Sequence, residues 1–186
     1  MNKKKFKKLL KKTWHFIWED NSIWSWVVNI ILAFVLIKFI VYPGLGLILS
    51  TSHPVVAVVS SSMEHNMNFE EWWEENKDWY MENGINEEDV ETSSFRNGFN
   101  KGDIMVLVGK DAKNIKVGNV IVFRSSKKDP IIHRVVKKFE DDNDIYFQTK
   151  GDNNEDSIKN DALDERNIRE EAIIGKAILR VPFWVI

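Results

Sequence analysis

The sequence contains no cysteine among its 186 residues. This absence excludes disulfide bonds, thiol nucleophiles and zinc sites built from cysteines. It does not decide the compartment, but a domain outside the cytoplasm would have to be stable without disulfides.

The chain also lacks a strong net charge, and the total of −2 hides an asymmetry. The first twenty residues carry seven lysines against Glu19 and Asp20, a net charge of +5, which leaves −7 for the rest by subtraction. An acidic remainder offers no basic groove for a phosphate backbone. We therefore expect no nucleic-acid partner.

One long apolar run covers residues 23–49. About 20 helical residues cross a hydrocarbon core of roughly 30 Å, so this run is expected to be a transmembrane anchor. Lys38 at mid-span costs about 2.5–3.5 kcal/mol on insertion scales, which the summed apolar residues exceed. Pro43, Gly44 and Gly46 are expected to break the helix. A buried core hairpin and a cleaved signal peptide are the alternatives.

Residues 1–22 are rich in lysine and carry apolar side chains at spacings of three and four. The apolar residues are Phe6, Leu9, Leu10, Trp14, Ile17 and Trp18. This pattern is typical of a basic amphipathic helix lying among lipid headgroups. Lysines beside a span indicate its cytoplasmic flank. We expect a single-pass protein with a cytoplasmic N-terminus and residues 50–186 outside.

Short β-rich runs follow the anchor, separated by turn sequences. The predicted strands are Val55–Val59, Ile104–Val108, Val120–Phe123, Ile131–Val136 and Ile145–Gln148, with a last strand pair in Ala172–Val181. Runs of β-branched residues between turns, without alternating helices, indicate a mainly β, antiparallel, barrel-like domain.

Residues 65–100 interrupt this pattern as an insertion. Asn68 to Glu71 resembles a capping box and Asn83-Gly84 a helix stop, so a helix is predicted between them. Its aromatic residues share one side: Trp72, Trp73, Trp79 and Tyr80. The insertion is either a lid or an element resting on the membrane, or it packs on the sheet. We favour packing, because anionic lipid would repel its acidic face.

Three polar islands lie at the edges of strand-like runs: Ser60-Ser61-Ser62-Met63-Glu64, then Ile131-Ile132-His133-Arg134-Val135, then Lys150-Gly151-Asp152-Asn153-Asn154. A hydroxyl, an imidazole and a carboxylate are the components of a serine nucleophile site. With Gly102-Asp103-Ile104 and Val117-Gly118-Asn119-Val120-Ile121-Val122-Phe123 between them, this order resembles the type I signal peptidases of the endoplasmic-reticulum and archaeal branch.

The resemblance implies that Ser62 is the nucleophile and His133 its general base. Of the other histidines, His15 lies in the inside segment, His53 beside the membrane, and His65 where the family usually has proline. Bacterial relatives use a lysine as the base, so Lys137 or Lys138 is the fallback. For the oxyanion, the resemblance implies the Ser62 backbone N–H together with the Ser60 hydroxyl. Ser61 replaces the usual glycine.

The orienting carboxylate is left open between several candidates. Asp152 matches the Gly-Asp-Asn-Asn motif, although that turn sequence also suits backbone geometry alone. The family commonly carries a second aspartate six residues later, where this chain has Ile158. Asp156 is the nearest substitute, and Asp161 is possible after a longer shift.

The implied function is a membrane-anchored serine endopeptidase that removes N-terminal signal peptides from secretory preproteins. The expected partners are these preproteins and the lipid bilayer, with a membrane partner subunit as a further candidate; no cofactor or metal is expected. The second hypothesis is a related fold that serves as a non-catalytic membrane subunit or binder. A metal site of His53, His65 and His133 is a third, although their spacing suits no common ligand motif.

Overall fold

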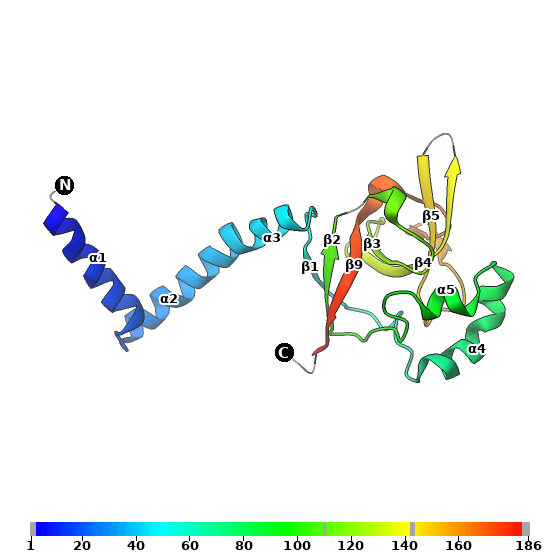
Figure 1. Cartoon of the computed structure of the whole chain (residues 1–186), viewed down its shortest axis with the longest axis horizontal. Helices are drawn as coiled ribbons and strands as arrows, with labels where there is room; N and C mark the ends of the chain where they lie inside the picture. The colour runs from blue at the N-terminus through cyan, green and yellow to red at the C-terminus, as the bar shows by residue number, and fades with distance from the viewer. Residues whose placement is uncertain (1–2, 110, 142–143, 184–186) are drawn as a thin grey trace. The chain divides into compact units, whose positions relative to one another are not determined.

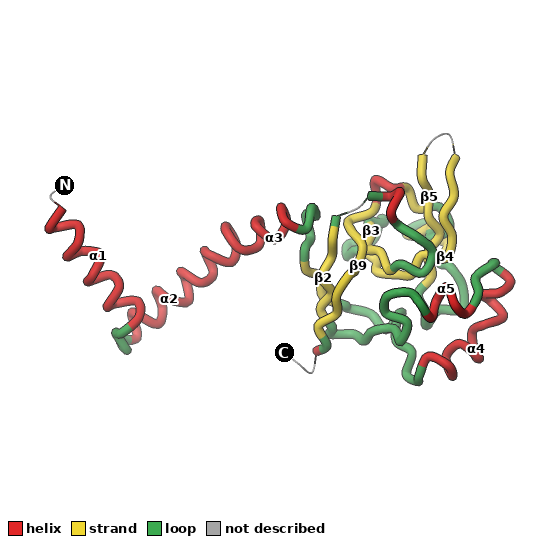
Figure 2. Tube along the Cα trace, in the orientation of Figure 1, coloured by secondary structure: helices red, strands yellow, loops and turns green. Residues whose placement is uncertain are grey.

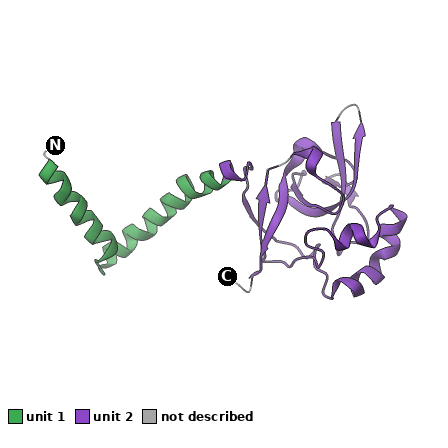
Figure 3. Ribbon diagram, viewed as in Figure 1, with its two compact units in different colours: residues 1–45 green, residues 46–186 purple. Residues whose placement is uncertain are grey.

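A computed structural model describes residues 3–109, 111–141 and 144–183 (Figure 1). The chain divides into two compact units, residues 1–45 and residues 46–186 (Figure 3). The first is helical, and the second contains all the described strands (Figure 2).

The first unit begins with the helix α1 (Lys3–Trp18), which turns into α2 (Ile23–Leu36). Two polar side chains of α2 hold this corner. The Ser25 hydroxyl donates to the Phe16 carbonyl at 2.6 Å, and the Asn29 amide donates to the Ile17 carbonyl at 2.9 Å. The last carbonyls of a helix have no partner within it. Asn29, a polar residue within an apolar run, thus satisfies one of them.

The apolar helix continues from α2 through the π-helical turn η1 (Ile37–Val41) and α3 (Tyr42–Ile48). Within the described part of the chain, Ile23–Ile48 is the one helix long and apolar enough to cross a membrane. The prediction that Pro43, Gly44 and Gly46 break it is wrong. Pro43 is the second residue of α3, one position after the residue that follows the wide π turn, a place where its missing N–H disrupts little.

The second unit is built on a seven-stranded sheet with the order β1-β2-β9-β3-β4-β5-β8, in which every neighbouring pair is antiparallel. Its strands are β1 (Val55–Ala57), β2 (Ile104–Val108), β3 (Val120–Phe123), β4 (Ile131–Asp141), β5 (Asp144–Lys150), β8 (Ile168–Arg169) and β9 (Ile173–Val181). A separate hairpin joins β6 (Lys159–Asn160) to β7 (Leu163–Asp164), and short 3-10 turns cover Ala112–Asn114 and Glu170–Ala172.

The sheet curls into a half-barrel around its buried side chains. Register shifts interrupt the ladders at Val106/Leu107, Val122/Phe123 and Val135/Lys137. Such irregularities bend a strand and increase its twist, which lets an antiparallel sheet curl. The predicted fold class, a mainly antiparallel barrel-like β domain behind an apolar helix, is confirmed.

The strand predictions fail in detail at the C-terminal end of the sheet. The expected strand pair in Ala172–Val181 is one strand, β9, because a 3-10 turn occupies Glu170–Ala172. The sequence analysis also missed β6, β7 and β8, which have two residues each and present no periodic pattern to detect.

The insertion forms α4 (Phe69–Glu82) and α5 (Glu87–Glu91). Asn68 caps α4, since its side chain accepts from the Glu71 N–H at 2.8 Å. The buried aromatic residues pack against Val136 of β4 in one cluster: Phe69, Trp72, Trp73 and Tyr80. The expectation that the tryptophan-rich segment packs on the sheet is confirmed.

Candidate active site

Ser62 lies in a turn that is held from both sides. Its carbonyl accepts from the Asn153 N–H at 2.8 Å, and the Asn153 side chain donates to the Ser61 carbonyl at 3.2 Å. The next residue, Met63, is buried in the core, and its carbonyl accepts from the Phe99 N–H at 2.9 Å. The serine backbone is therefore fixed before any ligand arrives.

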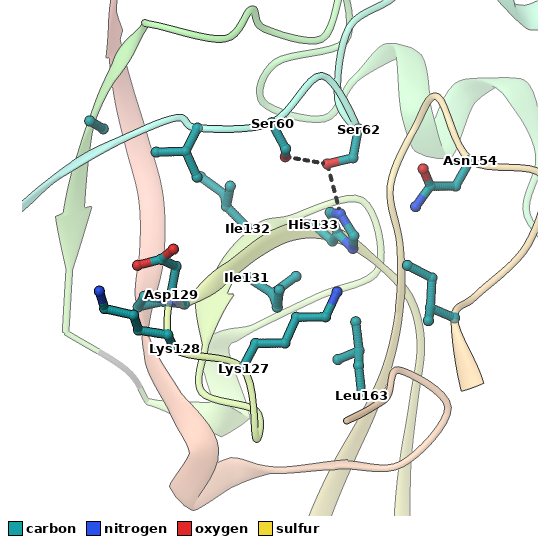
Figure 4. A pocket seen from close by; sticks show the side chains of 14 residues that line it. Ser60, Ser62, Lys127, Lys128, Asp129, Ile131, Ile132, His133, Asn154 and Leu163 are labelled. Carbon is teal, nitrogen blue, oxygen red and sulfur yellow. Dashed lines mark hydrogen bonds between the residues drawn. The ribbon is translucent and has the colours of Figure 1, made fainter. Parts of the chain in front are cut away.

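His133 lies on β4 with its ring directed at Ser62 (Figure 4). Its Nε2 is 2.9 Å from the Ser62 Oγ, and its Nδ1 contacts the Glu165 carboxylate. A carboxylate oxygen only accepts, so Nδ1 carries the proton and the Nε2 lone pair faces the serine hydroxyl. A neutral imidazole in this position can take the proton of an alcohol.

Glu165 is the carboxylate that the sequence analysis missed. It is completely buried, and its Oε1 accepts both from His133 and from the Thr149 hydroxyl, the latter at 2.8 Å. Its Oε2 accepts from the Ile158 N–H at 2.8 Å. Both oxygens are thus held, and the carboxylate fixes the ring in one orientation and one tautomer.

Glu165 lies across the β6–β7 hairpin from Ile158, the position at which the sequence analysis noted an isoleucine in place of an aspartate. Ile158 directly precedes β6 and Glu165 directly follows β7. The Glu165 N–H donates to the Ile158 carbonyl at 2.9 Å, and the Ile158 N–H donates to the Glu165 carboxylate, so the hairpin itself holds this carboxylate in place. The available signal was weak: Leu163 is buried and Asp164 exposed, so alternation puts residue 165 on the inner face.

Asp152 serves a different network from the one expected. Its carboxylate accepts from the Arg134 Nε at 2.8 Å and Nη2 at 2.6 Å, and from the His65 Nε2 at 2.9 Å. The structure does not bring it to the His133 ring. Burial alone would raise the pKa of Asp152, but the Arg134 guanidinium and the His65 hydrogen bond hold it well below its usual range.

This network joins the sheet, the Gly151–Asn154 turn and the insertion. Arg134 also donates to the Ser93 hydroxyl at 2.8 Å and to the carbonyls of Ser94 and Phe95. His65 stacks on Trp72 of α4, with ring centroids 4.1 Å apart. Asp152 and Arg134 therefore support the turn that holds Ser62, without contacting the Ser62 side chain.

The remaining acidic candidates are exposed. Asp156 pairs with the Arg166 guanidinium at 2.7 Å and accepts from the Trp79 indole at 3.2 Å. Asp161 lies in the turn between β6 and β7. The structure brings neither carboxylate to His133, whose two ring nitrogens face Ser62 and Glu165.

Ser60 lies beside Ser62, with its Oγ 3.1 Å from the Ser62 Oγ (Figure 4). A second hydroxyl at this distance is suitably placed to stabilise charge that develops on an acyl oxygen. Among the described residues, the non-glycine positions with positive φ are Ser50, Asn66 and Phe95. Ser61 is not one of them, so its backbone conformation does not require a glycine.

The alternative bases and ligands have other partners. The Lys138 ammonium donates to the carbonyls of Ala112, Lys113 and Ile115, and Lys137 lies over the Phe139 ring. The His53 ring contacts the Ser52 hydroxyl. Because His53, His65 and His133 each face different groups, they do not converge on one point; the described part of the chain contains no cluster of three or more metal-binding side chains.

Lys150 is a buried cation next to this network. Its ammonium lies 5.1 Å from the ring centroids of both Trp79 and Tyr80, and donates to the Gly151 carbonyl at 3.3 Å. Burial lowers the pKa of Lys150 to about 8, against the opposing charges of Asp152 and Asp156. For Tyr80 the direction is opposite, since the neutral form of tyrosine is the protonated one. Burial, followed by the negative charge of Asp152, raises the pKa of Tyr80 well above its usual value.

A cavity of about 390 Å³ opens over Ser62 and His133 (Figure 4). Ala57 and Val59 line one wall, and Ile131 and Ile132 line another. Among the described strands, β1 pairs only with β2, and the β4–β5 ladder starts at Arg134, so residues 131–133 pair with β3 alone. Two backbone edges without a strand partner therefore border the cavity.

Comparison with known proteins supports the resemblance expected from the motifs. No protein-family model matches the chain. The chain is 35% identical over 104 residues to the signal peptidase complex catalytic subunit SEC11C of Homo sapiens and, equally, of Mus musculus, with 50% of each chain covered. It is 28% identical over 148 residues to SEC11 of Fusarium vanettenii, covering 78% of this chain and 67% of the relative. The chain spans about half the length of the SEC11C relatives that it matches. These similarities confirm the predicted resemblance to signal peptidases of the endoplasmic-reticulum type.

Proposed function

We propose that this chain is a membrane-anchored serine endopeptidase that removes N-terminal signal peptides from secretory preproteins. The observation that carries the proposal is the hydrogen-bonded series from Ser62 through His133 to Glu165. It is supported by the similarity to signal peptidase catalytic subunits. The relatives' names refer to a complex, which favours a membrane partner subunit for this chain as well.

In the proposed reaction, the Ser62 Oγ attacks the scissile carbonyl carbon while its proton passes to the His133 Nε2. The C–N bond then breaks, and the same proton leaves with the amine of the mature protein. Water hydrolyses the resulting ester by the reverse roles, which frees the signal peptide and restores the serine. Glu165 stays ionised throughout and stabilises the imidazolium form of His133.

The Ser60 hydroxyl and the Ser62 backbone N–H are the proposed oxyanion donors. Ser60 is already within 3.1 Å of the attacking oxygen, so it needs little movement to reach the carbonyl oxygen in the tetrahedral intermediate. Removing one such donor typically slows acyl transfer by about 100- to 1000-fold.

The substrate is proposed to bind as an extended strand between β1 and residues 131–133 of β4. Both segments have a free backbone edge, and main-chain hydrogen bonds to such edges are a common way to hold a peptide. The walls formed by Ala57, Val59 and Ile132 leave a shallow apolar space beside Ser62. Small apolar side chains next to the scissile bond fit this space.

The apolar helix Ile23–Ile48 is proposed to be a single span with its lysine-rich flank in the cytoplasm. The site is then on the opposite face of the bilayer. Ser62 is the thirteenth residue after Leu49, a stretch that reaches at most about 45 Å, so the serine stays near the membrane surface. A signal sequence that spans the bilayer ends at this level.

The test is processing of a preprotein by the full-length chain reconstituted in liposomes. Ser62→Ala and His133→Ala are each expected to slow cleavage by at least about a thousandfold, because the nucleophile and its base act as one unit. Ser61→Ala is the matched control, since this neighbouring serine does not line the cavity. It is expected to keep the wild-type rate.

Cleavage that persists in both Ser62→Ala and His133→Ala would contradict the proposal. If the wild-type chain never cleaves a preprotein but co-purifies with a stable membrane partner, the non-catalytic subunit is the better assignment.

A further inference from the structure

The side-chain amide of Asn154 is a hydrogen-bond donor without a partner inside the catalytic cavity. Within residues 3–109, 111–141 and 144–183, the buried side-chain nitrogen and oxygen atoms without a hydrogen-bond partner are Asn29 Oδ1, His65 Nδ1, Asn154 Nδ2 and Arg180 Nε, and the last of these forms an ion pair with Asp103 at 2.6 Å. Of these residues, only Asn154 lines the cavity that contains Ser62 and His133.

The amide lies close to the reacting groups. A side-chain carbon added at Gly151 would be 2.7 Å from Asn154 Nδ2, 2.8 Å from the Ser62 carbonyl oxygen and 2.9 Å from His133 Nε2. Both nitrogens lie within about 3 Å of that single point, so Asn154 Nδ2 and His133 Nε2 are neighbours next to Gly151. The backbone holds the residue, because the Asn154 N–H donates to the Gly151 carbonyl at 2.9 Å.

Asn154 lies on one particular side of the nucleophile. In Figure 4 it is on the opposite side of the Ser62–His133 pair from Ile132 and Asp129, with its nitrogen directed toward the histidine. The β1 edge and residues 131–133 border the other side of the cavity. A peptide whose acyl part binds those edges passes Asn154 only after the scissile bond.

A buried N–H without a partner lowers the stability of the free protein, since folding removes the water that bonded it. A hydrogen-bond acceptor on a bound ligand would provide the missing partner for the Asn154 N–H. An extended peptide presents backbone carbonyls at regular intervals, and these need partners when the peptide is removed from water. Ile158 and Leu163 line the same cavity and offer apolar contact to a side chain nearby.

We propose that Asn154 forms a subsite for a backbone carbonyl of the substrate on the leaving-group side of the scissile bond. The inference rests on the proposed peptidase function and adds a specificity-determining residue to it. The donor contacts the mature part of the preprotein, next to the cleavage site, and takes no part in proton transfer.

The test compares Asn154→Leu, which has a similar volume and no donor, with Asn167→Leu, the same change at an exposed turn. With a full preprotein, Asn154→Leu is expected to raise KM about three- to tenfold with kcat within twofold, since the lost bond holds substrate and transition state alike. Asn167→Leu is expected to leave both constants unchanged.

A second substrate locates the subsite. It keeps the signal-peptide part but has an aminocoumarin as leaving group, so it has no carbonyl beyond the scissile bond. Asn154→Leu and wild type are expected to cleave this substrate equally well. An equal loss with both substrates would place the contact elsewhere and overturn the assignment.

Stability distinguishes a substrate contact from a structural one. Because the donor has no partner in the free protein, Asn154→Leu is expected to keep or raise the melting temperature. A clear drop would show that the amide serves the fold, directly or through a bound water, and would refute the inference. If wild type cleaves and Asn154→Leu has the same KM, only this inference fails; if wild type does not cleave at all, the proposed function fails with it.

Discussion

Replacing Glu165 by glutamine tests whether this carboxylate sets the chemistry of His133. The change keeps the size of the side chain and replaces one acceptor oxygen by an NH2 group. Oε1 faces His133 and Thr149, and Oε2 faces the Ile158 N–H. The amide nitrogen must therefore oppose a donor in either orientation.

The two orientations have different consequences. With the nitrogen toward Ile158, two N–H groups meet in a buried site, which costs about 1–3 kcal/mol of stability. With the nitrogen toward His133, the amide donates to Nδ1 and the ring moves its proton to Nε2. That tautomer has no lone pair for the Ser62 hydroxyl. A wrong tautomer of this kind lowers kcat by about 10⁴ in a serine protease with the same arrangement.

The expected result for Glu165→Gln is therefore a kcat reduced by about 10³ to 10⁴ with little change in KM. The assay is preprotein cleavage by reconstituted protein, with the melting temperature measured in parallel. Glu155→Gln is the matched control, because Glu155 is an exposed glutamate in the same segment and the change is identical. Its rate is expected to equal that of wild type.

Retention of activity within about threefold of wild type by a folded Glu165→Gln protein would refute the reasoning. The imidazole would then need no orienting carboxylate, and the contact with Glu165 would be structural. Glu165→Asp separates these cases further, since a shorter carboxylate that restores part of the kcat supports a role through the ring.

Three further predictions concern neighbouring residues. Ser60→Ala is expected to reduce kcat about 100- to 1000-fold by removing one oxyanion donor, measured by single-turnover cleavage; an unchanged kcat would exclude the hydroxyl from this role. Asp152→Asn is expected to lower the free energy of unfolding by about 3 kcal/mol in urea titrations, because it leaves the buried Arg134 guanidinium without its counter-ion; a change below about 1 kcal/mol would contradict this. For Lys150, the pKa of about 8 in the folded protein is below the value near 10.4 expected on unfolding, so between these values the unfolded chain binds more protons. The free energy of unfolding of wild type relative to Lys150→Met is expected to rise by about 2.5 kcal/mol from pH 8 to pH 10.5, and a flat difference would show that the ammonium is not desolvated.

The sequence predicts the main strands and the proximity of Ser62 and His133 better than it predicts the contact between His133 and Glu165. Ser62 and His133 stand in motifs whose neighbours fix their backbone, so local sequence carries their position. Glu165 follows a hairpin of two-residue strands, and its place beside His133 depends on how that hairpin folds back. Apart from the short alternation from Leu163 to Glu165, nothing in the neighbouring sequence distinguishes Glu165 from the other acidic residues of the chain.

Asp152 shows the opposite difficulty. Its motif marks it as important, and its complete burial agrees, but a motif does not tell which cation a carboxylate faces. In the fold, Arg134 and His65 take up its oxygens. The Pro43 prediction failed for a related reason, since a local rule for helix breaking did not consider the π turn that precedes it.

The guanidinium of Arg134 gives the insertion a part in the integrity of the whole domain. Its acceptors come from Ser93, Ser94 and Phe95 of the insertion as well as from Asp152. Trimming the insertion to produce a smaller protein would remove the Ser93, Ser94 and Phe95 acceptors and leave this buried cation with Asp152 and the Gly118 carbonyl. A shortened version of this protein therefore has to supply new acceptors to the Arg134 guanidinium, or it loses stability.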